Sequence, residues 1–219
     1  MSDIELIYSP GACSLAPHIL LHEIKAKFNL RKEQVGKFSP ELLALNPKAR
    51  IPVLLIGDTL ITENPAIMTA ISGLAPDKQL MGKPNTIEAA HVMEWLAWLS
   101  GTLHGNAFAL LLRPARFSDN AAHHKELQAK GKALIQNCFE AIEGRLQGDS
   151  EYAVGSRFTA VDAFLFVFYR WARLIFDWDL EALYPKYTSL AISVAARPSA
   201  ISALAAEGVS STVEVQHTL

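Results

Sequence analysis

Ser9-Pro-Gly-Ala-Cys-Ser-Leu-Ala-Pro-His18 joins a predicted strand to a predicted helix near the start of the chain. The preceding Ile4–Tyr8 segment is apolar and rich in strand-forming residues, and a proline–glycine pair interrupts it. The following Ser14–Glu23 segment predicts a helix that tolerates its proline only within the first turn. Cys13 is therefore expected at or just before a helix N-terminus, where free N–H groups favour the thiolate and lower the thiol pKa. The alternative is that Cys13 is a small packed residue of the interior.

Composition excludes several classes of protein. Half of the 219 residues are hydrophobic, enough to bury a core without disulfides or a structural metal. The formal net charge of −2 gives no electrostatic basis for binding nucleic acid or a membrane surface. The most apolar stretch, Ala160–Phe176, contains charged residues and falls short of the roughly 18 uninterrupted apolar residues of a membrane span. Two dissimilar cysteine sites and no signal-peptide pattern predict a cytoplasmic protein.

The chain divides into two halves with different patterns. Residues 1–75 alternate short apolar runs with helical segments, which predicts a small α+β domain. Within it, Gly57-Asp58 predicts a tight turn between two antiparallel strands, Val53–Ile56 and Thr59–Ile61. Residues 76–84, with prolines at both ends, predict a linker. Residues 85–219 predict an all-helical domain, with helices over Thr86–Leu112, Ser118–Leu146, Thr159–Phe176 and Tyr187–Ala196.

Two features of the helical half are interpreted as structural. Cys138 shares one helix face with Leu134 and Ile142, which indicates a core position rather than a redox partner. Thr159 and Asp162 have the spacing of a capping box, which accounts for the acidic residue without a catalytic role.

Five segments, in this order along the chain, resemble the cytosolic glutathione transferases, and bacterial beta-like members most closely. They are Tyr8–His18, Asn46–Val53, Thr62–Ile67, Val154–Asp162 and Ala196–Pro198. The resemblance implies a thioredoxin-like N-terminal domain, an all-helical C-terminal domain, a homodimer, and a site for glutathione, as co-substrate, at the domain junction.

The resemblance also implies which residues bind glutathione. Pro52 should follow a cis peptide bond, so that the backbone of Ile51 pairs with the cysteinyl unit. Glu63 and Asn64 open a helix and should hold the ammonium and carboxylate of the γ-glutamyl unit. Without the resemblance, Glu63 would simply favour the helix dipole. Asn64 stands where the family often has serine.

His104 is the third predicted element of the site. In beta-like transferases a histidine here faces the active site and a lysine follows it, whereas this chain has Gly105. His104 is therefore expected either to form a hydrogen bond in the active site or to be a polar residue at the domain interface. The other histidines show no metal-ligand spacing, and no metal site is predicted.

Two chemistries and one non-enzymatic function remain open. In the first, the Ser14 hydroxyl or the helix N-terminus stabilises the glutathione thiolate, which is then conjugated to a small electrophile. In the second, Cys13 itself attacks a disulfide or thioether and forms a mixed disulfide with glutathione, which a second thiol resolves. The alternative to both is a non-catalytic, transferase-like interaction module. The helical half also contains tryptophans that could line an acceptor pocket, the core or a dimer interface, and their spacing favours the core: Trp95, Trp98, Trp171 and Trp178.

Overall fold

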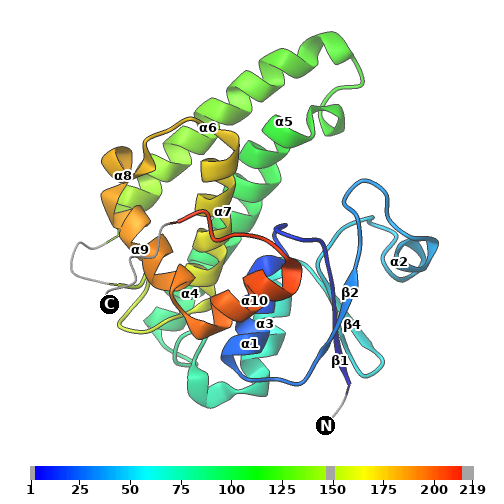
Figure 1. Cartoon of the computed structure of the whole chain (residues 1–219), viewed down its shortest axis with the longest axis vertical. Helices are drawn as coiled ribbons and strands as arrows, with labels where there is room; N and C mark the ends of the chain where they lie inside the picture. The colour runs from blue at the N-terminus through cyan, green and yellow to red at the C-terminus, as the bar shows by residue number, and fades with distance from the viewer. Residues whose placement is uncertain (1–2, 147–150, 214–219) are drawn as a thin grey trace.

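The computed structural model describes residues 3–146 and 151–213, which form a small sheet domain and a helical domain (Figure 1). The N-terminal elements are β1 (Ile4–Tyr8), α1 (Leu15–Glu23), β2 (Asn29–Lys32), α2 (Pro40–Leu45), β3 (Val53–Ile56), β4 (Thr59–Thr62) and α3 (Asn64–Leu74). The larger helices that follow are α4 (Ile87–Trp98), η2 (Leu99–Phe108), α5 (Ala109–Leu112), α6 (His124–Arg145), α7 (Ala160–Ile175), α9 (Pro185–Ala195) and α10 (Pro198–Glu207). Single turns are η1 (Pro76–Lys78), η3 (Pro114–Arg116), η4 (Ala121–His123) and α8 (Leu180–Leu183). This architecture confirms the predicted fold.

The four strands form one mixed sheet in the order β2-β1-β3-β4. Strand β1 pairs parallel with β2 and antiparallel with β3, and β3 and β4 form the predicted hairpin across Gly57-Asp58. Successive side chains of a strand point to opposite faces. Accordingly, Leu6 packs with α1 and α3 on the face toward the helical domain, whereas Ile7 packs with Leu42 of α2 on the other face.

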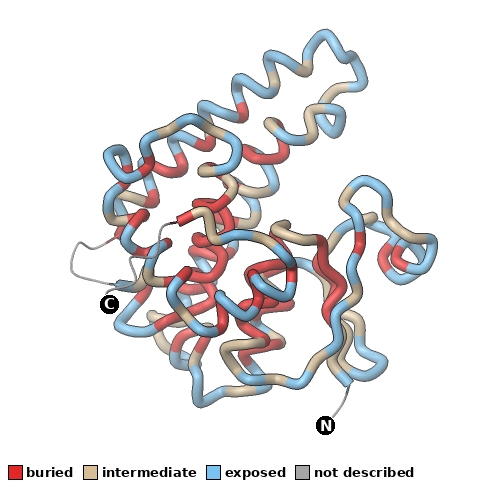
Figure 2. The backbone as a smooth tube through the Cα atoms, viewed as in Figure 1, coloured by how far each residue is buried: buried red, intermediate tan, exposed pale blue. Residues whose placement is uncertain are grey.

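Helix α7 is the centre of the helical domain. Every residue from Ala160 to Arg170 is buried, and Figure 2 shows this buried segment between the outer helices. The predicted capping box is present, because the Thr159 amide donates to the Asp162 carboxylate at 2.7 Å. The Ala153 amide also donates to Asp162 at 2.7 Å, so the carboxylate ties the preceding loop to the helix. Burial raises the pKa of Asp162 to about 6.

Several helix boundaries differ from the predictions. Helix α6 begins at His124 rather than Ser118, because the Ser118 and Asn120 side chains accept backbone N–H groups and hold a turn there. Cys138 on α6 is buried, as predicted. The predicted Thr86–Leu112 helix is continuous, but its middle, η2, is π-helical.

Helix α10 is absent from the predictions and packs directly along α1 (Figure 1). Its last residue, Glu207, is buried against the sheet domain. The predicted domain boundaries remain predictions; α3 ends at Leu74, η1 lies in the predicted linker, and α4 begins at Ile87.

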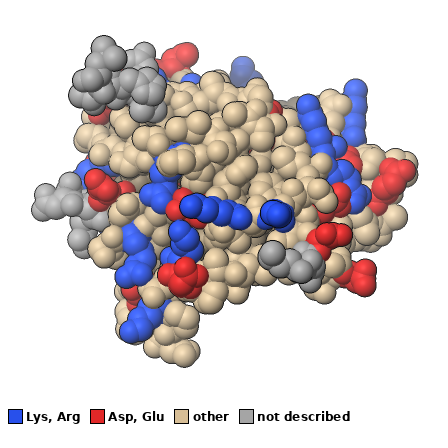
Figure 3. Space-filling model, turned by 60° about the horizontal axis from the view of Figure 1, so that its bottom comes forward, with Lys and Arg blue, Asp and Glu red and all other residues tan. Residues whose placement is uncertain are grey.

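The surface carries both signs of charge in close proximity. On the face shown in Figure 3, basic and acidic side chains lie beside one another around a broad uncharged area.

Within the described ranges, no single helix is long and apolar enough to span a membrane; α9 and α10 reach that length only as a pair bent by 78°.

Candidate active site

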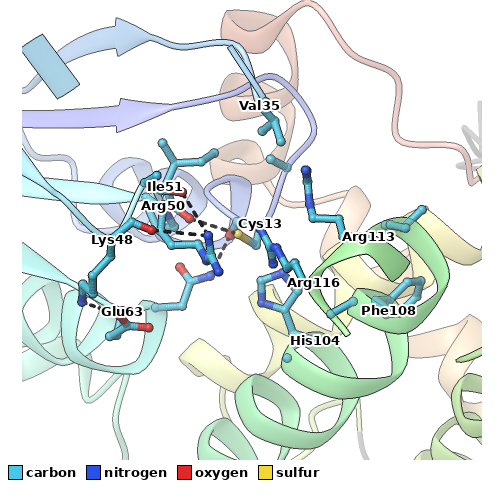
Figure 4. Close-up of a pocket in the computed structure, with 18 of the residues that line it drawn as sticks. Cys13, Val35, Lys48, Arg50, Ile51, Glu63, His104, Phe108, Arg113 and Arg116 are labelled. Carbon is cyan, nitrogen blue, oxygen red and sulfur yellow. Dashed lines mark hydrogen bonds and ion pairs between the residues drawn. The ribbon is translucent and has the colours of Figure 1, made fainter. Parts of the chain in front are cut away.

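A cleft of about 1020 Å³ separates the sheet domain from η2 and α5 of the helical domain. The structure places the predicted site residues on its wall, from the Cys13 turn, the loop before β3, the start of α3, and η2 (Figure 4). Those that line the cleft are Cys13, Ile51, Pro52, Glu63, Asn64 and His104. Ser14 is the exception.

Cys13 lies where the loop after β1 enters α1, and its side chain is nearly enclosed. Its Sγ donates a long hydrogen bond, 3.6 Å, to the carbonyl of Ile51. Burial raises the pKa of the Cys13 thiol to about 12 and outweighs the opposing effects of the Asn64 amide, the local backbone N–H groups and Arg113. The prediction of a lowered pKa is therefore wrong. The helix N-terminus does favour the thiolate, but losing contact with water costs more.

Alkylation of Cys13 by iodoacetamide is expected to be slow near neutral pH and to accelerate only above pH 9. The physical reason is that the thiolate is the reactive species and its population follows the raised pKa. Mass spectrometry of the labelled peptide, over a series of pH values, measures the profile, and the protein unfolded in urea provides the unperturbed reference. A Cys13 profile with a midpoint below pH 8.5 would contradict the structure.

Ser14 turns its hydroxyl into the protein instead of the cleft. The hydroxyl accepts a hydrogen bond from the Ser9 amide and donates one to the Ser9 carbonyl, each 3.2 Å long, and the residue is fully buried. The hydroxyl therefore closes the turn that carries Cys13. This geometry contradicts the expectation that Ser14 stabilises the glutathione sulfur, because its hydrogen-bonding capacity is used within the loop.

Residues of the helical domain form hydrogen bonds with both backbone polar groups of Gly11. Its amide donates to Glu207 of α10 at 2.7 Å, and its carbonyl accepts from the Trp171 indole at 2.8 Å. Its φ of +66° favours glycine, and a Cβ here would lie 2.8 Å from the guanidinium of Arg170. Glu207 also bonds to His18 of α1 at 2.8 Å, with both side chains fully enclosed. The loop that carries Cys13 is thus positioned by residues far away in the sequence.

The loop before β3 presents its backbone to the cleft. The Ile51–Pro52 peptide bond is cis, as the resemblance implied. The Asn46 amide donates to the Arg50 carbonyl at 2.8 Å and fixes the start of this loop. Ile51 and Cys13 consequently face each other across one end of the cleft.

Glu63 and Asn64 occupy the N-terminus of α3. Glu63 has a φ of +69°, a conformation rare for a residue with a Cβ and often found at functional sites. Its exposed carboxylate pairs with Lys48 at 2.6 Å. The buried Asn64 amide donates to the Cys13 carbonyl at 3.3 Å, while its Oδ1 has no hydrogen-bond partner among the described residues. That oxygen is itself buried, and a buried acceptor without a partner is costly.

His104 projects from η2 toward Cys13 and lies beside Arg116 (Figure 4). Its ring packs against Phe168 and Trp171, with centroid distances of 5.9 and 5.5 Å. Burial, followed by the charges of Arg116, Arg113 and Arg50, lowers the pKa of His104 to about 4. The imidazole is therefore neutral at physiological pH and has one N–H to donate.

Gly105 has a local reason for being glycine. A Cβ at this position would lie 2.9 Å from the Ser100 carbonyl oxygen, five residues earlier in the π-helical stretch. A lysine here would require the backbone to shift. Positive charge reaches the site from elsewhere, through Arg50, Arg113 and Arg116.

Sequence reasoning missed these three arginines as site residues. Two signals were present: Arg50 directly precedes the Ile51–Pro52 pair, and Arg113-Pro-Ala-Arg116 follows the helix that carries His104. The described parts of the chain contain no cluster of three or more His, Cys, Asp or Glu residues that could bind a metal ion.

Comparisons with known proteins agree with this site. Residues 6–72 match the family model of the glutathione S-transferase N-terminal domain, and residues 121–189 match that of the C-terminal domain. The glutathione S-transferase GstA of Escherichia coli O157:H7 is 36% identical over 212 residues, covering 94% of this chain and all of that protein.

Solved structures of similar proteins share the whole fold. A beta-class glutathione S-transferase of Sphingomonas chungbukensis is 32% identical, with a TM-score of 0.82 over 94% of this chain and 100% of the other. A sphingomonad glutathione S-transferase complexed with glutathione is also 32% identical, with a TM-score of 0.81 over the same shares. On these matches, which span both domains, the chain belongs to the glutathione S-transferase family.

Proposed function

We propose that the cleft binds glutathione and conjugates its sulfur to a small electrophile. The observation that carries this proposal is the convergence of three elements on one point: Cys13 bonds to the Ile51 carbonyl at 3.6 Å and receives the Asn64 amide at 3.3 Å on its own carbonyl. An extended peptide that pairs with the Ile51 backbone would therefore place its side chain beside Cys13. A solved relative complexed with glutathione supports this choice of ligand.

The ends of the tripeptide match the groups around this point. The γ-glutamyl ammonium suits the exposed Glu63 carboxylate, and the adjacent carboxylate suits the N-terminus of α3. The glycyl carboxylate would then point toward Lys37 and Arg50 on the sheet-domain wall.

The chemistry follows from the protonation states of the site. Because the pKa of Cys13 is raised, its thiol remains protonated and serves as a hydrogen-bond donor rather than a nucleophile. Together with the neutral His104 N–H and the positive field of the arginines, it would stabilise the glutathione thiolate. The thiol proton passes to solvent, and the thiolate forms the new C–S bond. The electrophile either releases its leaving group to solvent or, if it is an activated alkene, gives up the electron pair of its C=C bond and takes up a proton. No observation favours disulfide exchange through Cys13, and family membership favours an enzyme over an interaction module.

Glu63→Gln is expected to weaken glutathione binding about tenfold to a hundredfold, because it removes a charge-assisted contact to the ammonium. Isothermal titration calorimetry with reduced glutathione measures the change. Glu41→Gln on α2, which removes the same charge outside the cleft, is the control and should bind as the wild type does. If the wild-type protein binds no glutathione at millimolar concentration, the proposal is wrong.

We also propose that the chain forms a homodimer through α3 and α4. These adjoining helices expose apolar side chains, including Leu74, Ile87 and Met93, of which Ile87 is 73% exposed. Ala90 and Ala97 extend the exposed arc on α4. A second copy of the chain would cover this face. The proposal keeps glutathione as the co-substrate and the cytoplasm as the location, both as predicted from the sequence.

Met93→Glu is expected to convert the dimer to a monomer, since it places a charge at the centre of the apolar arc. Sedimentation velocity reports the mass. Leu183→Glu is the matched control, because Leu183 is also exposed but lies on α8 in another part of the surface. A wild-type monomer at all concentrations, or equal dissociation of both variants, would argue against this interface.

A further inference from the structure

Three arginines lie on the side of the cleft where the second substrate, the acceptor of the glutathione sulfur, would bind. Arg50 reaches it from the sheet domain, while Arg113 and Arg116 reach it from the end of α5 and from η3 (Figure 4). Among the described residues, the Arg50 guanidinium bonds only to carbonyls of its own loop, at 3.2 and 3.3 Å. The guanidinium groups of Arg113 and Arg116 make no hydrogen bond or ion pair to any described residue.

The arginines are close enough to repel one another. Burial, followed by the charges of Arg50 and Arg113, lowers the pKa of the Arg116 guanidinium below its ordinary value. The same three charges act on His104. Arg50 and Arg116 are exposed and Arg113 is half-buried. Water and salt therefore moderate the repulsion, but the positive field of the cluster still favours an anion beside it.

The described wall of the cleft does not supply that anion. Glu63 is the acidic residue among the described lining residues, and its carboxylate is already bonded to Lys48. The inference here rests on the proposed function, in which glutathione contributes its glycyl carboxylate near Lys37 and Arg50. Arg113 and Arg116 then remain without a negative partner on the side from which the second substrate must approach.

The surface around these two arginines is apolar. Phe108, Leu112 and Trp171 line the same part of the cleft, and Leu112 is 49% exposed. An acceptor that suits this wall has an apolar or aromatic body and a negatively charged group. Guanidinium groups bind carboxylates in particular, through paired N–H donors.

We propose that the second substrate is an electrophile carrying a carboxylate, which Arg113 and Arg116 bind while its unsaturated body packs on Phe108, Leu112 and Trp171. For an α,β-unsaturated ketone of this kind, the glutathione thiolate adds to the β-carbon and forms the C–S bond. The electron pair of the C=C bond moves to the carbonyl, giving an enolate. A proton on the α-carbon restores the ketone, so nothing leaves and no oxidant is needed.

Ethacrynate and its methyl ester test this assignment, since both have the same unsaturated ketone and only one is charged. Each kcat/KM is divided by the uncatalysed rate constant with glutathione. The wild type is expected to prefer the acid at least tenfold, and the Arg113→Gln/Arg116→Gln double variant to lose most of that preference. Arg157→Gln removes the same charge outside the cleft and should keep the wild-type preference.

The outcomes separate this proposal from the proposed function. Turnover of both compounds without a preference for the acid overturns the carboxylate assignment and leaves conjugation intact. A preference that survives in the double variant, with a raised KM for glutathione, assigns the arginines to glutathione and also overturns it. Without turnover, calorimetry of the acid and the ester in the presence of S-methylglutathione makes the same comparison, and equal affinities are decisive against the proposal. Absence of glutathione binding altogether rejects the proposed function as well.

Discussion

Asp162→Ala is expected to lower the free energy of unfolding by about 3–5 kcal/mol, because it leaves several buried donors without an acceptor. The carboxylate accepts the Ala153 amide at 2.7 Å, the Thr159 amide at 2.7 Å and the Thr159 hydroxyl at 3.0 Å, and it is fully buried. Urea denaturation followed by circular dichroism measures the loss. Asp179→Ala is the matched control, because Asp179 caps α8 at the surface through one bond and should cost about 1 kcal/mol.

The same carboxylate has a characteristic pH dependence. Because its pKa in the folded state, about 6, lies above its ordinary value, the folded state binds the proton more tightly than the unfolded state. Protonation of Asp162 therefore stabilises the folded state as the pH falls from about 6 to 4. This stabilisation is lost as the pH rises through the folded-state pKa. The difference in stability between wild type and Asp162→Ala should accordingly widen toward pH 4, and a constant or narrowing difference would count against the raised pKa.

Glu207→Ala is expected to reduce kcat/KM for conjugation by about a hundredfold or more, although Glu207 does not line the cleft. The variant removes the acceptor of the Gly11 amide and the partner of the enclosed His18, so the loop that carries Cys13 loses its anchor. Steady-state kinetics with saturating glutathione measure the loss.

Glu207→Gln separates positioning from charge, because its amide oxygen can still accept from Gly11 while its amide nitrogen can donate to His18. It should recover most of the activity. If the alanine variant retains wild-type kinetics while only its melting temperature falls, Glu207 stabilises the fold without positioning the site.

The parts of the fold that were predictable have short-range causes. The Gly57-Asp58 hairpin, the Thr159–Asp162 capping box and the wholly apolar α7 each depend on residues a few positions apart. The resemblance to a family added the cis peptide bond before Pro52, which the residues alone did not favour. On the sheet-domain side, local pattern and family motif together predicted that Cys13, Ile51–Pro52 and Glu63–Asn64 would meet at the cleft, but they missed Arg50 and the orientation of Ser14.

The parts that were missed depend on tertiary structure. Helix α10 begins at a proline after another helix, and its role in holding Gly11 exists only once α10 lies along α1. The Cys13 pKa was predicted with the wrong sign because a helix N-terminus is visible in the sequence, whereas enclosure by Ile51 and Asn64 is not. Arg113 and Arg116 become site residues only where the helical domain faces the sheet domain.

The π-helical stretch before α5 also determines how the acceptor site can change through mutation. A π-helical segment has the register of an α-helix that has taken in an extra residue. Deleting one residue between Ser100 and Gly105 would restore ordinary winding and change which side chains of the stretch face the cleft, while α5 beyond it keeps its direction. The position of His104 in the cleft therefore depends on the present register. Because His104 lies within this stretch, a single-codon deletion would alter the acceptor pocket and the group that faces the glutathione sulfur in one step.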